Sequence, residues 1–536
     1  MPTAELPEGI QKWPLQNWTN GHQNFTHQFT KDASFKLTLP DSLTSSTQKY
    51  KATTANFMWL INYAIANKIQ LRAMGNGWSF SEVAVSEGGV VDTKSLRLSF
   101  ALANSFVAPQ YLNTGKKSSD LFFVQCGMSM LQLSEKLEAA GRSLKASGAS
   151  NGQSIAGATA TGTHGAAFKV GAVHDTVLGL HIITGANKQV WIEKASNPVA
   201  SGEFIDWLGA EKISNDDVFN AAIVSFGSFG FVHGVLLETE PIFLLEEHKT
   251  SEVTYNELLT RALNKFDFSG LENILPLSST VTPGKDFYHF EVLINPHDFA
   301  PNDPTKGVYL KAMYKIPYVS NYTRRIRENK GFLYGDNTLG LVQTILDTLG
   351  PTLSAPLVPR LVNALLPLVF KPGPPLFGTV GETFNNTRFR GKAASAAIGL
   401  NAADASRVLE EIIAINKSNP FPGAIAFRYV KGTSALLGFT KFPLTCVLEM
   451  DGVDAAASRT FIQKVWDRLQ ALNIPFTEHW GKFNFNLNGP LVRKMYGNAA
   501  VDTWLNCRRQ LLDDETRTVF NNAFLSKIGL DKQAVV

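Results

Sequence analysis

Cysteine and clustered basic charge are both scarce in this sequence. Only 3 of its 536 residues are cysteine, and their wide separation matches neither a disulfide framework nor a metal site, so we expect buried thiols. The net charge of +4 comes from 50 basic and 46 acidic residues, and the densest basic cluster lies within 324–327. Because a nucleic-acid-binding protein concentrates its basic residues on one face, we expect no nucleic-acid partner.

Long apolar runs are also lacking. The Leu-, Val- and Pro-rich segment 339–378 comes nearest, but Asp347, Arg360 and several prolines interrupt it, so we expect no integral membrane span. We interpret the segment as short buried helices, with a lid for a hydrophobic substrate or a membrane-touching surface as alternatives. The N-terminus has no secretion signal, which predicts a cytoplasmic protein or one already trimmed of its signal.

The chain is too long for a single core. We expect an N-terminal arm over 1–50, a first domain over 51–242, a strand-rich domain over 243–470 and a C-terminal segment over 471–536. Apolar periodicity predicts helices over 52–67 and 129–141 and strands over 68–74, 88–93, 120–128, 286–296 and 423–432.

Three turns of small residues recur in the first domain, at 75–77, 157–165 and 227–230. Such turns expose backbone amides, which form concave sites for anions. Three of them separated by strands predict an extended anionic ligand with a pyrophosphate. None matches a P-loop or a G-x-G-x-x-G motif opening a helix, so a nucleotide cofactor would be held in an unusual way.

Four motifs carry a resemblance to a known family. "RAMGNGWSFS", "SIAGATATGTHG", "SFGSFGFVHG" and "EHWGK" occur in the order seen in the vanillyl alcohol oxidase superfamily of FAD-dependent oxidoreductases. The sequence is most similar to its aldonolactone and alditol oxidase branch and to type II cholesterol oxidase. The resemblance implies an α+β fold, in which a two-part FAD-binding domain over 51–242 is joined to an antiparallel-sheet substrate (cap) domain. Residues 471–536 would return to the active site.

The resemblance also implies which residues hold FAD. The loop that would wrap the pyrophosphate consists of Met74, Gly75, Asn76, Gly77, Trp78 and Ser79. The small residues that would let the backbone lie along the isoalloxazine and ribityl chain are Ala158, Gly162, Thr163 and Gly165. Val232 would offer its backbone to the adenine.

Trp78 stands where similar oxidases have a histidine bonded covalently to the flavin. An indole has no nucleophilic ring nitrogen. We therefore expect non-covalent FAD, which favours a dehydrogenase slightly over an oxidase.

The chemistry that the resemblance implies is hydride transfer from a CH–OH carbon to flavin N5. The substrate would be a sugar, polyol, lactone or related alcohol, with a lipophilic, sterol-like alcohol as the alternative. O2 or an external acceptor would then take the electrons. Lys482 would place a cation near the reduced ring, and His479 would orient substrate or lysine, unless either is merely structural.

Arg428 lies where related enzymes carry a Glu-x-Arg pair beneath the flavin, but position 426 is alanine. Alternation along the strand 286–296 puts His289 and Glu291 on one face, and either could replace the missing carboxylate. An ordinary strand with a solvated face is the other interpretation.

His164, in "GTHG", is either a catalytic base or a residue that makes a structural hydrogen bond. The Ala426 departure leaves a non-catalytic flavin- or nucleotide-binding protein open. A hydrolase using His164 or His479 is a further alternative. We expect no metal site.

Overall fold

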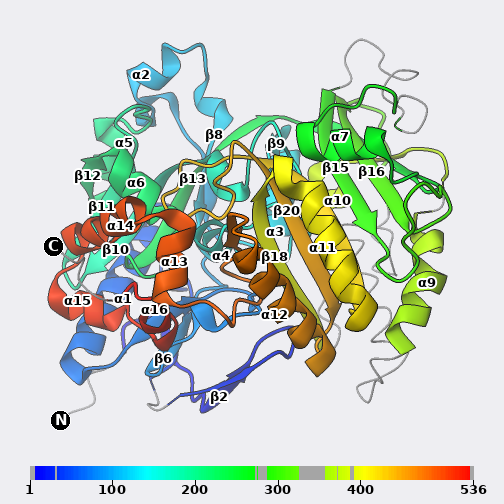
Figure 1. The fold of residues 1–536 in the computed structure, drawn as a ribbon. Helices are drawn as coiled ribbons and strands as arrows, with labels where there is room; N and C mark the ends of the chain where they lie inside the picture. Colours follow the sequence, from blue (N-terminus) through cyan, green and yellow to red (C-terminus); the bar gives the residue numbers. More distant parts are fainter. Residues whose placement is uncertain are drawn as a thin grey trace.

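The computed structural model of the protein describes residues 6–29, 33–271, 275, 286–324, 357–370, 372–386 and 392–531. Figure 1 shows two halves, with the first half of the chain and the C-terminal helices on the left and a large sheet on the right.

Described strands of the first half form two sheets. The smaller has the order β1–β4–β6–β5, and its strands β4, β5 and β6 run parallel. The larger has the order β12–β11–β10–β13–β8–β7, with β9 beside β13. The bounds in the smaller sheet are β1 Ile10–Lys12, β4 Phe35–Leu37, β5 Leu71–Met74 and β6 Gly89–Asp92. In the larger sheet they are β7 Ser99–Ala101, β8 Leu121–Gln125, β9 Arg142–Leu144, β10 Val177–Gly185, β11 Lys188–Glu193, β12 Glu211–Ser214 and β13 Phe231–Pro241.

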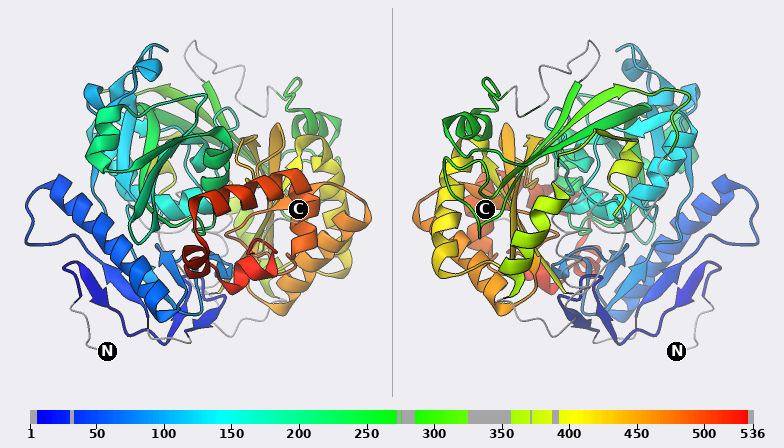
Figure 2. Two further views of the ribbon diagram at one scale, coloured as in Figure 1. Left: turned by 90° about the vertical axis from the view of Figure 1, so that its left-hand side faces the viewer. Right: turned by 90° about the vertical axis from the view of Figure 1, so that its right-hand side faces the viewer.

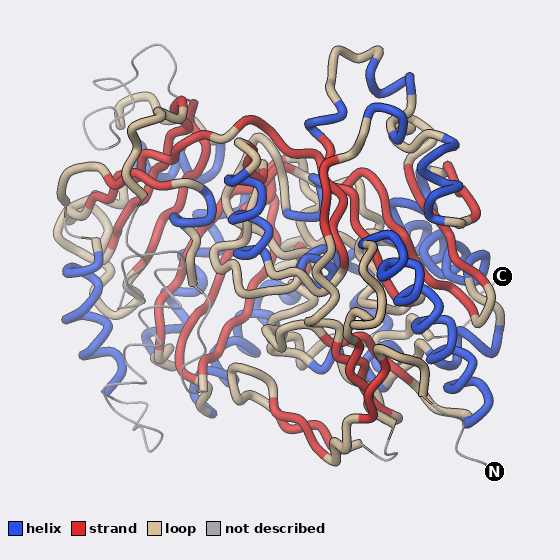
Figure 3. Tube along the Cα trace, turned by 180° about the vertical axis from the view of Figure 1, so that it is seen from behind, coloured by secondary structure: helices blue, strands red, loops and turns tan. Residues whose placement is uncertain are grey.

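Described strands of the second half form one antiparallel sheet in the order β17–β14–β16–β15–β19–β20–β18–β21. Their bounds are β14 Phe243–Thr250, β15 Asp286–Ile294, β16 Val308–Pro317, β17 Leu376–Gly378, β18 Ala393–Asn401, β19 Gly423–Lys431, β20 Leu444–Val453 and β21 Phe476–Glu478. The predicted α+β class with an antiparallel second sheet is confirmed. Figure 3 shows these strands from behind, on the left.

Helices lie around the sheets and, in the case of α4, between them. In the first half they are α1 Ser46–Asn67, α2 Pro109–Leu112, α3 Met130–Ala139, α4 Ile155–Thr161, α5 Gly202–Leu208 and α6 Asp216–Ala222. In the second half they are α7 Glu257–Lys265, α9 Val358–Val369, α10 Val380–Thr383, α11 Ala405–Ser418 and α12 Ala456–Ala471. The C-terminal helices are α13 Gly489–Tyr496, α14 Asn498–Leu511, α15 Asp514–Val519 and α16 Ala523–Lys527, and Figure 2 shows them lying across the first half of the chain.

Local signals explain several of these boundaries. Helix α3 begins at Ser129, whose side chain accepts from the Gln132 amide while the Gln132 side chain bonds back to Ser129, a capping box. The predicted turn over 157–165 is wrong in part. Its alanines continue α4 as far as Thr161, and Gly162 ends the helix with a φ of 79° that glycine adopts without strain.

The apolar segment 339–378 is described only in part, because residues 339–356 and 371 lie outside the described residues. Helix α9 buries Val362 and Leu366 and leaves Leu368 69% exposed. It therefore packs by one face rather than lying within a core. Among the described helices, none has the length and apolar character needed to cross a membrane.

Candidate active site

A pocket of about 1450 Å³, open solvent included, lies between the two halves. One wall is the loop that follows β5, and another is the face of the large sheet at β18, β19 and β20. The segment after β21 closes it, with His479, Gly481 and Lys482 at its border. The pocket therefore joins all four motifs that the sequence singled out.

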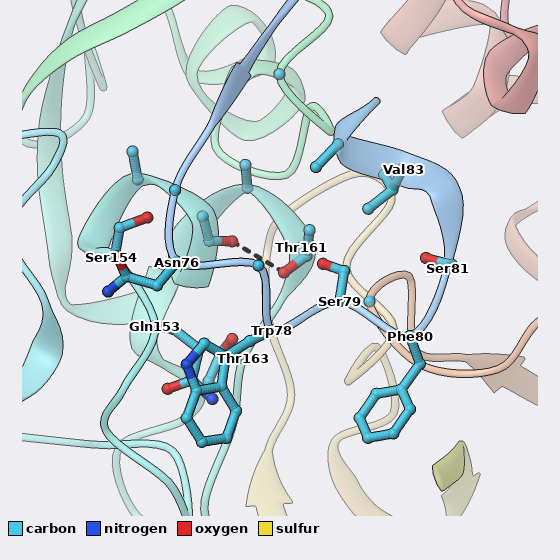
Figure 4. A pocket seen from close by; sticks show the side chains of 18 of the residues that line it. Asn76, Trp78, Ser79, Phe80, Ser81, Val83, Gln153, Ser154, Thr161 and Thr163 are labelled. Atoms are coloured by element: carbon cyan, nitrogen blue, oxygen red, sulfur yellow. Dashed lines mark hydrogen bonds between the residues drawn. The ribbon is translucent and has the colours of Figure 1, made fainter. Parts of the chain in front are cut away.

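Glycine is needed in the loop after β5 for two different reasons. Gly77 has a φ of 71°. A Cβ on Gly75 would overlap the Ser154 side chain, at the start of α4. The loop is held by the Asn76 side chain, which donates to the Gly152 carbonyl at 2.6 Å. Figure 4 shows this loop passing between Ser154 on one side and Val83 on the other.

Polar groups in this wall point to a bound anion. Among the described residues, the backbone amides of Asn76, Gly77 and Ser79 have no hydrogen-bond partner. Two buried side-chain oxygens that border the same pocket, Ser150 Oγ and Gln153 Oε1, also lack one. Since buried polar groups are normally satisfied, this set fits a polar ligand with phosphate groups.

The N-terminal segment fixes the outer side of the loop. Its strands β2 (Asn17–Thr19) and β3 (Thr26–Gln28) form a hairpin. In the turn between them, the Gly21 amide donates to the Gly77 carbonyl at 3.0 Å, and the Asn20 side chain donates to the Ser79 carbonyl at 3.0 Å. Because the carbonyls are bound outside, the loop keeps its amides available to the pocket.

Trp78 packs its indole on the Gly152 backbone, where a Cβ would overlap the ring. The His22 ring meets the indole edge-on, with centroids 5.5 Å apart, and stacks on Phe80 at 4.1 Å. Burial lowers the pKa of His22 to about 3, so this ring is neutral at pH 7. The aromatic side chains thus anchor the loop while the indole borders the pocket.

The predicted cofactor residues divide into two groups. The residues that border the pocket are Met74, Gly75, Asn76, Gly77, Trp78, Ser79, Thr163 and Val232. Ala158 is buried inside α4, Gly162 faces Phe439, and a Cβ on Gly165 would overlap the Ser147 carbonyl. The smallness of these three residues serves backbone packing around the pocket instead of contact with its interior.

A row of charged side chains crosses the large sheet on the face toward the pocket. The row runs from Lys311 on β16 through Glu291 on β15 and Arg428 on β19 to Glu449 and Asp451 on β20. All five are 1% exposed or less. Burial on this scale is tolerated because each charge has a neighbour of opposite sign, with Lys482 beside the two acids at the end of the row.

Arg428 lies at the centre of this row. Its guanidinium donates to Glu291 Oε1 through Nε at 3.1 Å and Nη2 at 3.0 Å, and its Nη1 binds Glu449. Lys482 donates to the other oxygen of Glu449, and its Nζ lies 3.9 Å from Asp451. Arg428 and Lys482 therefore bind the same carboxylate at the pocket. The sequence did not predict this contact for either residue.

Glu291 and His289 lie on the strand beside Arg428 and do not border the pocket. Burial alone would raise the pKa of Glu291, but Arg428 and Lys311 hold it well below its usual range. His289 Nε2 lies 3.4 Å from Glu291. Of the two residues proposed to replace the missing carboxylate, Glu291 does bind Arg428, but it does not border the pocket.

Sequence reasoning missed Glu449, Asp451 and Ser395, all three of which border the pocket. The Ser395 hydroxyl donates to Asp451 at 2.5 Å. The available signal was the alternation of two acids in the otherwise apolar strand "TCVLEMDGV". Acids at alternate positions of a buried strand share one face, and a buried charge needs a reason.

The pocket histidines are both neutral, but they differ in tautomer. His164 Nδ1 lies 3.0 Å from the Gly165 carbonyl, which only accepts, so Nδ1 carries the proton and Nε2 keeps its lone pair. In His479 the Gly481 amide donates to Nδ1 at 2.9 Å, so Nε2 carries the proton. Burial lowers the pKa of His164 to about 4, against the opposing effect of Glu449, and lowers that of His479 well below its usual range.

Two further buried histidines lie away from the pocket. His233 stacks on Tyr50 in the core, and His174 binds Thr433; neither borders the pocket. Within the described ranges, no group of three or more His, Cys, Asp or Glu side chains could hold a metal ion. The three cysteines are buried, as expected.

Comparison with protein families identifies the domain that forms one side of the pocket. Residues 52–193 match a family described as "FAD binding domain". The chain is 27% identical over 179 residues to L-gulono-1,4-lactone dehydrogenase of Mycobacterium tuberculosis, covering 33% of this chain and 34% of that protein. It is 30% identical over 149 residues to L-gulonolactone oxidase 3 of Arabidopsis thaliana, covering 27% and 23%. The matches therefore span about a third or less of these relatives.

The fold comparison extends over both halves. The crystal structure of cholesterol oxidase from B. sterolicum superposes with a TM-score of 0.67 at 14% identity, covering 98% of each chain. This likeness concerns the fold, and it includes the large antiparallel sheet as well as the matched domain. With its four motifs gathered around one pocket, the chain has an FAD-binding domain over 52–193 and shares its two-domain fold with cholesterol oxidase.

Proposed function

We propose that the protein is an FAD-dependent oxidoreductase that oxidises the CH–OH group of a small polar alcohol, such as a sugar-derived lactone or polyol. The observation that carries this proposal is the polar end of the pocket, where Arg428, Glu449 and Lys482 meet two neutral histidines. The lactone oxidoreductases among its relatives agree with this class of substrate.

The polar groups that border the pocket fit the polar parts of FAD. The amides of Asn76, Gly77 and Ser79 would hold the pyrophosphate, and Ser150 and Gln153 offer further polar contacts. Bound FAD would supply the acceptor for the hydride that leaves the alcohol carbon. With Trp78 in the loop, we propose that FAD is held without a covalent bond.

Oxidation of an alcohol also releases the hydroxyl proton, and His164 is the group suited to take it. Its Nε2 is unprotonated, borders the pocket and lies 3.6 Å from Glu449, whose charge would stabilise the resulting imidazolium. His479 cannot take this role through Nδ1, which already accepts from Gly481. Its protonated Nε2 and the Lys482 ammonium are instead available to donate to a substrate oxygen.

Substrate polarity follows from the same residues. Ser395, Asp451 and Lys482 would face any molecule in this part of the pocket. An apolar alcohol would cover these groups without hydrogen-bonding them, which costs free energy. Hydroxyl groups of a sugar-derived substrate would satisfy them. O2 or another electron acceptor would be the second substrate.

The same experiment tests two alternatives to this proposed function. A sterol-like alcohol is favoured by the fold of cholesterol oxidase and by the apolar segment of α9, although α9 does not border the pocket. A non-catalytic flavin-binding protein is favoured by Ala426.

The experiment is to mix the purified yellow protein anaerobically with sugar lactones, alditols and cholesterol and to follow the flavin absorbance. Bleaching by a lactone or alditol is expected. Bleaching by cholesterol alone would favour the sterol-like substrate, and no bleaching by any alcohol would overturn the proposed activity.

A further inference from the structure

The carboxylate that is missing at position 426 enters the site from the neighbouring strand. Ala426 on β19 pairs directly with Glu449 on β20. Side chains of directly opposed residues in an antiparallel pair lie on the same face, with their Cβ atoms about 5 Å apart. A glutamate at 449 therefore occupies the same patch of the sheet as a glutamate at 426 would.

Glu449 also makes the contacts that a partner of Arg428 has to make. One of its oxygens accepts from Arg428 Nη1, and the other accepts from Lys482 Nζ. Its side chain is 1% exposed, yet it borders the pocket. A carboxylate buried this deeply is stable only with such partners, and its loss would leave two cations facing the pocket.

The other carboxylate beside Arg428 has a different position. Glu291 binds the Nε edge of the guanidinium and also the Lys311 ammonium, and it lies away from the pocket. Glu291 thus anchors Arg428 from the neighbouring strand. Of the two carboxylates that bind Arg428, Glu449 is the one that borders the pocket.

We propose that Glu449 is a positioning residue that takes over, from the adjacent strand, the place of the absent glutamate at 426. It keeps Arg428 and Lys482 turned toward the pocket and offsets the charge that His164 gains when it accepts a proton. The expected change in kcat/KM rests on the proposed function. The expected change in the flavin midpoint potential rests only on the contacts of Glu449 with Arg428 and Lys482.

The test compares four variants: Glu449→Gln, Glu449→Ala, the exchange variant Ala426→Glu/Glu449→Ala, and Glu411→Gln. The last one removes a surface ion pair with Arg468, between α11 and α12, and is the matched control. The exchange variant conserves volume across the strand pair, because one side chain is shortened while its neighbour is lengthened.

Three measurements are made on each variant: kcat/KM with the alcohol found above, the flavin midpoint potential, and the unfolding temperature without FAD. For Glu449→Gln we expect kcat/KM to fall about 100-fold, as when a group that supports proton transfer is removed. Its midpoint potential should become more positive, because two cations lose their shared anion. The exchange variant should regain at least tenfold in kcat/KM over Glu449→Ala, and part of the lost unfolding temperature.

His164 adds a pH signature. It faces Glu449, Lys482, Arg428 and His479, and only Glu449 is negative. Because Glu449 raises the pKa of His164, its removal should move the acid limb of the pH profile of kcat/KM to lower pH. An unchanged limb, an unchanged potential, or an exchange variant that behaves like Glu449→Ala would overturn the proposal. If no alcohol reduces the wild-type protein, the proposed function fails, while the potential and the unfolding temperatures still decide the role of Glu449.

Discussion

His164 and His479 lie beside each other with ring centroids 5.6 Å apart, yet their backbone contacts give them opposite hydrogen-bonding roles. His164 donates from Nδ1 to a carbonyl, whereas His479 accepts at Nδ1 from an amide. One ring therefore offers a lone pair at Nε2 and the other offers a proton.

This difference predicts different outcomes for the same substitution. His164→Gln should lower kcat/KM by about 100-fold or more, because the proton acceptor is lost. His479→Gln retains a donor and should cost about tenfold or less. Steady-state kinetics on variants with equal FAD content measure both; equal losses would contradict the assignment.

The loop after β5 gives a second prediction. Gly75→Ala should weaken FAD retention, because the new Cβ overlaps the Ser154 side chain and one of the two has to move. Adding Ser154→Gly should restore binding, since it removes the obstructing atoms. Gly202→Ala is the matched control, because a Cβ there meets nothing within 4 Å. Flavin absorbance per protein after gel filtration is the measurement, and failure of the second substitution to rescue would argue against this cause.

Much of this site could be predicted from local sequence. The glycine loop at 75–77, Arg428 and Lys482 carry their own motifs, and the structure gathers them at one pocket. Helix α1 follows from its apolar spacing, and α3 from its cap. These features depend on residues near one another in the chain.

Glu449 could not be assigned in this way, because its role depends on strand register. The alternating acids of β20 indicate that Glu449 and Asp451 share a face, but the pairing of Glu449 with Ala426 depends on how β19 and β20 align, which neither strand shows by itself. Asn20 was missed for a similar reason. It lies in a short polar hairpin without periodicity, and its partner Ser79 is 59 positions away.

The N-terminal hairpin supplies a third prediction. Asn20→Ala removes the hydrogen bond to the Ser79 carbonyl and the bonds that order Asn24. Three partly buried hydrogen bonds are worth about 1–3 kcal/mol, so FAD affinity should fall about tenfold. Thr19→Ala, which loses only an exposed bond to Thr26 within the hairpin, should bind FAD normally. Fluorescence titration of the apoprotein with FAD compares the two.

Trp78 leads to a fourth prediction, that acid precipitation releases all of the flavin. The indole has no ring nitrogen that could form the bond. Flavin fluorescence that migrated with the protein on a denaturing gel would rule this out. Gly152→Ala should weaken FAD retention by displacing the indole from its backbone contact, with Gly202→Ala again as control.

Buried neutral histidines make stability depend on pH. Burial lowers the pKa of His181 to about 4, compared with about 6.5 in an unfolded chain. Between these values the unfolded state binds the proton and the folded state does not, so stability is highest above pH 6.5 and falls as the pH drops toward 4. Each such histidine contributes a loss of about 1.4 kcal/mol per pH unit within that window.

His181→Asn isolates this contribution, because His181 lies in the core between Tyr50 and Gln189, away from the pocket. Unfolding by denaturant at pH 7 and pH 5 should show a smaller loss of stability in the variant than in the wild-type protein. Gly202→Ala, where a Cβ meets nothing within 4 Å, is the control and should keep the wild-type loss. A variant at 181 with an undiminished loss would mean that this ring takes up its proton without unfolding.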